Sequence, residues 1–111
     1  MATRGEIWHA DLSPTRGREQ RGKRPVLIVS ADQLNNGPAQ LVIVVPLTTT
    51  ERRIPLHVRI DPPNGGVREP SFAMCEALRS ISKERLDDRW GKIDAQTMRV
   101  VDDRLQIVLD L

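Results

Sequence analysis

The first half of the chain alternates between apolar and polar residues with the two-residue period of a β-strand. Residues 5–12 place Trp8, Ala10 and Leu12 on one face and Ile7 on the other. This alternation predicts a strand that begins the fold.

Two continuous apolar runs follow, at residues 26–30 and 41–45, with Asn-Asn-Gly-Pro turn chemistry at 35–38 between them. Both runs are rich in β-branched residues, which favours buried strands over helices. Pro25 is expected to begin the first run, since proline cannot occupy the middle of a central strand. Residues 42–45 are apolar on both faces, so we expect a second subunit, rather than the chain's own helix, to cover one face.

The second half predicts two more strands and one helix. Residues 56–60 alternate and are followed by a Pro- and Gly-rich turn at 62–66, and a further strand is expected over 72–82. From Ala95 onward the apolar residues change to spacings of three and four, which predicts a terminal helix with Asp94 as its N-cap. The apolar stripe consists of Met98, Val101, Leu105, Val108 and Leu109.

These elements make one mainly β domain over residues 1–111. Closely spaced strands with one helix at the end predict a strongly bent antiparallel sheet or partial barrel that the helix covers. A hydrophobic content of 39% with 29% charged residues is that of an ordinary soluble globular protein and excludes a disordered chain.

The net charge of +2 is too small to indicate nucleic acid, but its distribution is uneven. Five basic residues lie between positions 15 and 24, against Glu19 alone. They are Arg16, Arg18, Arg21, Lys23 and Arg24. The cluster suits a phosphate site, and a solvated charged loop is the alternative.

Cys75 is the single cysteine, which excludes an intramolecular disulfide and favours a reducing compartment. The first residues have no apolar leader, and no apolar run is long enough to span a membrane. We therefore expect a cytoplasmic protein with no membrane association.

Residues 5–30 resemble the opening of the MazF/PemK family of toxin endoribonucleases. The resemblance depends on Gly5-Glu6-Ile7-Trp8, Asp11-Leu12, Pro14, Gly17, Glu19-Gln20, Arg24-Pro25-Val26 and Val29-Ser30. Two further stretches resemble later family motifs, Val45-Pro46-Leu47-Thr48-Thr49 and Cys75-Glu76 with Leu78-Arg79-Ser80-Ile81.

The resemblance implies an SH3-like antiparallel barrel of the CcdB/PemK toxin type, a homodimer, a single-stranded RNA substrate and a cognate antitoxin. Ala77 stands where many members carry Gln, and Met74 where the PemK-like branch has Arg. The acid–base pair of that branch is therefore incomplete, and the MazF-like arrangement with Arg24 and Thr48 is expected instead.

Cutting RNA without a metal uses the neighbouring 2′-OH as nucleophile. His9, His57 and Cys75 show no ligand spacing, so we expect no metal and no cofactor. On this hypothesis Arg24 stabilises the charged phosphorane and Thr48 donates a hydrogen bond to the same phosphate. Glu76 is the candidate base, with an ion pair to Arg79 or a neighbouring basic residue as the alternative. His9 is expected to be a solvated strand residue, and no function is assigned to His57.

RNA contacts are assigned to Arg16, Arg18, Glu19, Gln20, Lys23, Thr49, Arg79 and Ser80. The only aromatic residues are Trp8, Phe72 and Trp90, so base selectivity is expected to come from polar groups and loop shape. Two alternatives stay open: a non-catalytic CcdB-like inhibitor of DNA gyrase and an inactive SH3-like binding module.

Overall fold

The computed structural model describes residues 1–13 and 22–111. Arg16, Arg18, Glu19 and Gln20 lie outside these residues, so their predicted RNA contacts stay predictions. The described part contains seven strands: β1 (Glu6–Asp11), β2 (Lys23–Ile28), β3 (Leu41–Thr48), β4 (His57–Ile60), β5 (Ser71–Met74), β6 (Arg79–Ser82) and β7 (Leu86–Lys92). The helices are α1 (Asp32–Asn35) and α2 (Ala95–Leu109), with short 3₁₀ turns η1 (Asn64–Gly66), η2 (Cys75–Ala77) and η3 (Lys83–Arg85).

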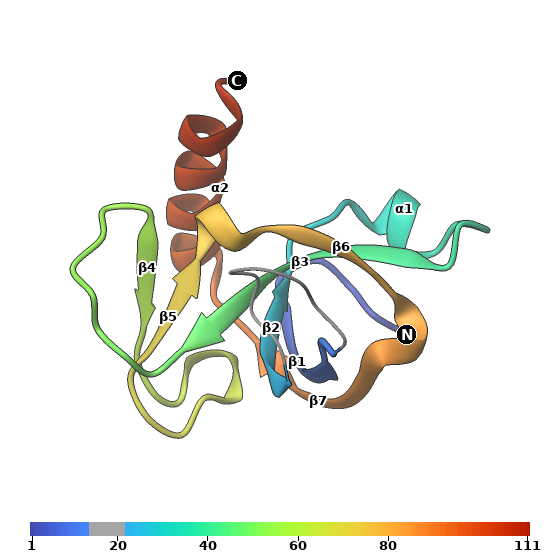
Figure 1. The fold of residues 1–111 in the computed structure, drawn as a ribbon, viewed down its shortest axis with the longest axis horizontal. Coiled ribbons are helices and arrows are strands. Elements are labelled where there is room, and N and C mark those ends of the chain that lie inside the picture. Colours follow the sequence, from blue (N-terminus) through green and yellow to red (C-terminus); the bar gives the residue numbers. More distant parts are fainter. Residues whose placement is uncertain (14–21) are drawn as a thin grey trace.

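The strands form one antiparallel sheet in the order β4-β5-β3-β2-β1-β7, with β6 also paired to β3 (Figure 1). The sheet bends strongly around β3, which is long enough to pair with β6 along its first half and β5 along its end. The mainly β fold with a C-terminal helix is confirmed.

The strand predicted over 72–82 is wrong as a single element. The structure divides it into β5 and β6, with η2 between them. Ala73 pairs with Leu47, and Arg79 pairs with Val44. Ala73 and Arg79 are six positions apart in the sequence, but their partners on β3 are only three positions apart. The three extra residues form η2, which bends this edge of the sheet.

Alternation along the strands separates the interior into two clusters on opposite faces of the sheet. Val26, Val42 and Val44 belong to the cluster inside the barrel. Leu27 and Val45 belong to the cluster under α2. The prediction that a second subunit covers one face of 42–45 is therefore wrong: the chain buries both faces itself, which explains the unbroken apolar run.

Helix α2 lies against β4 and η2, and it begins where the sequence predicted. The side chain of Asp94 accepts a hydrogen bond from the backbone N–H of Thr97 at 2.7 Å, which confirms the N-cap. Met98 and Val101 are buried, but Leu109 at the end of the stripe is half exposed. No helix in residues 1–13 and 22–111 is long and apolar enough to cross a membrane.

Strand β7 was not predicted, because the sequence Leu-Asp-Asp-Arg-Trp-Gly-Lys shows no apolar alternation. Among the described strands it pairs with β1 alone, and that pairing is interrupted at two register shifts. Edge strands of this kind carry charges and irregularities that discourage pairing with other chains. Strand β2 also differs from expectation: it begins at Lys23, and its recorded pairing with β3 starts at Val26, after Pro25.

Candidate active site

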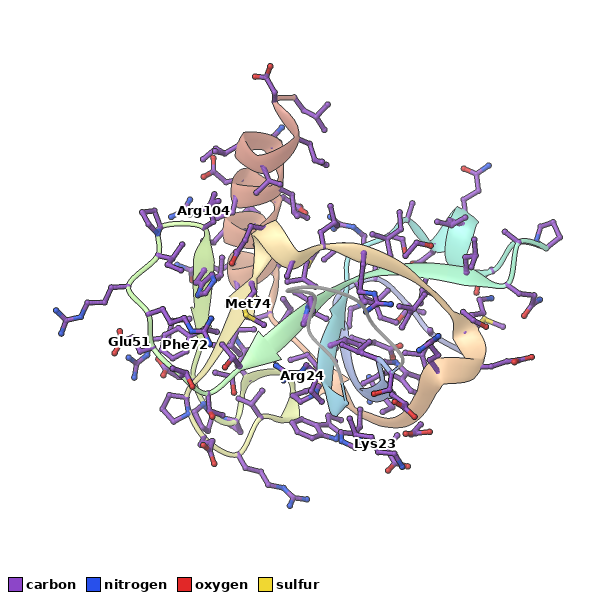
Figure 2. All side chains as sticks on the ribbon, viewed as in Figure 1. Lys23, Arg24, Glu51, Phe72, Met74 and Arg104 are labelled. Atoms are coloured by element: carbon purple, nitrogen blue, oxygen red, sulfur yellow. The ribbon has the colours of Figure 1, made fainter. Side chains whose placement is uncertain are left out.

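Arg24 lies at the start of β2, where this strand passes the end of β3. It pairs with Ala10 of β1 on one side. On the other side Val26 pairs with Pro46, and continuing this register by two residues brings Arg24 opposite Thr48. The Nη1 of Arg24 donates to the carbonyl of Leu47 at 3.4 Å, so its guanidinium reaches the end of β3 (Figure 2).

Arg24 and Thr48 line the same open pocket, with a volume of about 220 Å³. Its described lining is Arg24, Pro25, Leu47, Thr48, Thr49 and Ser71. The strands that supply these residues, β2, β3 and β5, are adjacent in the sheet but far apart in the sequence. The hypothesis from the sequence requires Arg24 and Thr48 to reach one phosphate, and the structure places both side chains in the lining of one pocket.

The described residues leave part of the Arg24 guanidinium without a hydrogen-bond partner. Its Nε is buried and has no hydrogen-bond partner among the described residues. A buried donor without a partner destabilises a fold by roughly 1–3 kcal/mol, and more when the group is charged. The guanidinium that carries this donor also lines the open pocket, so an anionic ligand there can provide acceptors for its charge.

The hydroxyl groups of the pocket differ in whether their hydrogen is free to donate to a ligand. Thr48 Oγ1 accepts a hydrogen bond from the backbone N–H of Thr50 at 3.2 Å, which leaves its own hydrogen available to a ligand. Ser71 already donates to the carbonyl of Glu69 at 2.9 Å and is buried. Sequence reasoning missed Ser71, because only the pairing of β5 with β3 brings it to the pocket.

No carboxylate or imidazole is present in the described lining of the pocket. In the part of the chain that the structure describes, no three His, Cys, Asp or Glu side chains gather closely enough to hold a metal ion. The donors in this lining are a guanidinium and hydroxyl groups, which bind and stabilise a phosphate oxygen rather than a cation.

Glu76 lies outside the described lining of the pocket. It is on η2, and its Oε2 is 2.7 Å from Nε2 of His57. The sequence left open an ion pair with Arg79 or a neighbouring basic residue, and the partner observed here is a histidine from β4. The side chain of His57 is only 3% exposed, whereas that of Glu76 is 39% exposed. Sequence reasoning missed this pair, because the two residues are 19 positions apart.

The other predicted RNA contacts are spread over the sheet. Thr49 lines the pocket beside Thr48, and Lys23 is the exposed neighbour of Arg24. Arg79 and Ser80 pair with Val44 and Ile43, about four residues along β3 from Thr48. The structure therefore brings Thr49 to the pocket, whereas Lys23 lines a separate pocket with Asp11 and Glu84. Arg79 and Ser80 lie on β6, beside an earlier part of β3.

His9 lies away from the pocket, on β1. Its ring stacks on Trp90 with centroids 6.2 Å apart, and its Nδ1 is 4.0 Å from Asp87. Trp8, on the opposite face, packs against the barrel cluster and donates from its indole N–H to Glu6. His9, expected to be solvated, is therefore a partly exposed strand residue, and neither side chain belongs to the described pocket lining.

Comparison with known proteins finds relatives over nearly the whole chain. A family model described as "PemK-like, MazF-like toxin of type II toxin-antitoxin system" matches residues 3–109. The chain is 38% identical over 112 residues to Endoribonuclease EndoA of Bacillus subtilis, covering 100% of this chain and 97% of that one. It is 35% identical to Endoribonuclease MazF9 of Mycobacterium tuberculosis, covering 100% and 98% of the two chains.

Solved structures share the fold over nearly the whole chain. MazF from Deinococcus radiodurans superposes with a TM-score of 0.87 at 22% identity, covering 99% of this chain and 97% of that one. A mycobacterial endoribonuclease in complex with its cognate antitoxin superposes with a TM-score of 0.84 at 28% identity, covering 100% and 97%. This chain belongs to the PemK-like, MazF-like family of toxins of type II toxin–antitoxin systems.

Proposed function

We propose that this protein is a sequence-specific endoribonuclease that cleaves single-stranded RNA in the pocket of Arg24 and Thr48, without a metal ion, and so inhibits translation. The observation that carries the proposal is one open pocket lined by both the guanidinium of Arg24 and the hydroxyl of Thr48. The relatives EndoA and MazF9, both named endoribonucleases, support RNA as the substrate.

In this mechanism the 2′-OH loses its proton to a base and attacks the adjacent phosphorus. The bond to the 5′-oxygen of the next nucleotide breaks, and that oxygen takes a proton from solvent and leaves as a 5′-OH. The Arg24 guanidinium accommodates the charge that develops on the phosphorane, since its planar fork matches phosphate oxygens. Thr48 donates its free hydroxyl hydrogen to the same phosphate. The charged donor, Arg24, is expected to contribute roughly 3–4 kcal/mol of transition-state stabilisation.

Glu76 is the proposed base that takes the 2′-OH proton. Its carboxylate is accessible to RNA and is held at Oε2 by His57. Since Glu76 does not line the pocket, the nucleotide has to extend from the phosphate held at Arg24 toward η2 for the transfer to occur. This requirement makes the role of Glu76 separately testable.

The proposed function is tested by incubating the purified protein with a long RNA in EDTA. Cleavage into discrete fragments that end in a 2′,3′-cyclic phosphate and a 5′-OH is expected, because 2′-OH attack leaves these ends. A matched RNA with a 2′-deoxy nucleotide at a mapped site is expected to stay intact there. Cleavage of the deoxy site, or dependence on a divalent ion, would contradict the mechanism. A CcdB-like gyrase inhibitor would leave both RNAs uncut.

We also propose a homodimer that a cognate antitoxin neutralises in the cytoplasm. Val100 and Ile107 are exposed apolar residues seven positions apart on α2, which places them on one face for a second copy to cover. The antitoxin complex among the structural neighbours supports a protein inhibitor. Sedimentation at micromolar concentration is expected to show a dimer, and a monomer would contradict this proposal.

A further inference from the structure

A row of side chains crosses the sheet from the pocket toward β4. Thr48 pairs with Phe72 across β3 and β5, and Phe72 pairs with Arg59 across β5 and β4. Directly opposed residues of antiparallel strands project to the same face, so these three side chains share one face. The neighbouring row of Leu47, Ala73 and Val58 belongs to the cluster under α2. The Thr48 row therefore faces away from α2.

The guanidinium of Arg59 is oriented by two neighbours. Its Nε donates to Oδ1 of Asp61 at 2.8 Å, and its Cζ lies 5.8 Å from the centroid of the Phe72 ring. These contacts restrain both an edge and a face of the planar group. The Arg59 side chain nevertheless stays 52% exposed. A restrained plane with much of its surface open to solvent is suited to stacking.

None of the three aromatic residues is as well placed for this role. Phe72 is 7% exposed and lies beneath Arg59. Trp8 packs against the barrel cluster. Trp90 is partly exposed but is stacked on His9, at the edge strand β7. Proteins that bind single-stranded RNA stack its bases on aromatic rings or on arginine planes. Near this pocket, the exposed plane of that kind belongs to Arg59.

We propose that Arg59 forms a nucleobase-stacking subsite for a nucleotide that flanks the scissile phosphate. This inference rests on the proposed function, because Arg24 and Thr48 locate the phosphate. Two strand spacings of roughly 4.8 Å put the Arg59 backbone about 10 Å from that of Thr48. A base next to the phosphate in the pocket reaches the Arg59 plane, and Asp61 and Phe72 keep that plane fixed before RNA arrives.

The test uses short RNAs built around a cleavage site of the wild-type protein, each with one flanking nucleotide made abasic. Single-turnover kcat/KM is measured for the wild type and for Arg59→Ala. For wild type, one abasic position is expected to lower kcat/KM by about tenfold, the usual effect of losing one stacked base. Arg59→Ala is expected to show the same loss on intact RNA and no further loss on that abasic RNA.

Two further variants separate stacking from charge. Arg59→Lys keeps the charge and loses the plane, so it is expected to behave like Arg59→Ala; full activity of Arg59→Lys would mean a phosphate contact and overturn the proposal. Asp61→Asn loosens the plane and is expected to give a smaller loss on intact RNA alone. Arg99→Ala, an exposed charge on α2, is the control and is expected to keep the wild-type abasic profile.

The outcomes distinguish this inference from the function on which it depends. Independent, multiplicative losses from Arg59→Ala and from every abasic position would overturn the stacking subsite and leave the nuclease proposal standing. Wild-type protein that cuts none of the RNAs would overturn both.

Discussion

Arg24 and Arg89 lie on β2 and β7, the two strands that flank β1, but their guanidinium groups differ in how many hydrogen bonds the described residues provide. Arg89 on β7 donates from Nε to the carboxylate of Glu6. Glu6 also accepts from the backbone N–H of Thr3 at 2.7 Å and the indole of Trp8 at 3.1 Å. Its side chain is 7% exposed. Arg24, by contrast, makes one long bond to a carbonyl and leaves a buried N–H without a partner among the described residues.

This difference in hydrogen bonding distinguishes a charged group that stabilises the fold, Arg89, from one that is suited to bind a ligand, Arg24. Burial raises the pKa of Glu6, but hydrogen bonds from Arg89, Thr3 and Trp8 outweigh it and hold that pKa below its ordinary value. The ionised network is therefore part of the native state. Removing a member of a satisfied network costs stability, whereas removing an unsatisfied donor costs little. Substitutions in the two regions should consequently affect different measurements.

The largest expected effect is on catalysis by Arg24→Ala. The rate of RNA cleavage should fall about 10³-fold, because the phosphorane loses its main cationic donor. The melting temperature should stay unchanged or rise, since an unsatisfied buried N–H is removed. Arg24→Lys, which keeps the charge but not the fork, should recover only part of the rate. Folded Arg24→Ala protein that cuts at the wild-type rate would remove the central claim.

Glu76→Gln tests whether a partnered carboxylate also acts in the reaction. If Glu76 takes the 2′-OH proton, the rate of RNA cleavage should fall about 10²-fold. The amide can still bond His57, so the fold should be retained in a thermal melt. Glu84→Gln, an exposed glutamate on η3, serves as control. A loss smaller than threefold would mean that Glu76 stabilises the fold through His57 and does not act in the reaction.

Glu6→Gln should act on stability. The free energy of unfolding at pH 7 should fall by roughly 2 kcal/mol, because charge-assisted hydrogen bonds are lost. The native pKa of Glu6 is lowered, so its contribution is complete above the ordinary value of 4.5 and is lost as the pH falls below it. The difference between wild type and variant in denaturant unfolding should therefore shrink toward pH 3. Glu69→Gln, an exposed carboxylate, should show no such difference.

Thr48→Val should have the smallest of these effects, about a tenfold loss in kcat/KM, equal to one neutral hydrogen bond of roughly 1–1.5 kcal/mol. Thr48→Ser should restore the rate, since it returns the hydroxyl. Thr50→Val is the matched control, because Thr50 is exposed and lies outside the described pocket lining. Equal losses for the two valine variants would mean that β3 is disturbed rather than that a ligand contact is lost.

The sequence by itself determined the local elements. Alternation in residues 5–12, the apolar runs at 26–30 and 41–45, and the stripe after Asp94 each correspond to an observed strand or to α2. These patterns are reliable because a strand or helix imposes its period on its own residues. The family resemblance also selected Arg24 and Thr48 before their pairing in space was known.

Only the tertiary structure decided which segments meet. The polar residues of β7 form a strand because they pair with β1. Residues 72–82 bend because this segment has three residues more than the part of β3 with which it pairs. The contacts of Glu76 with His57, and of Arg59 with Phe72, depend on strand register. Register is a property of two segments that pair, whereas periodicity is a property of one, and this is why the sequence predicted the strands but not these contacts.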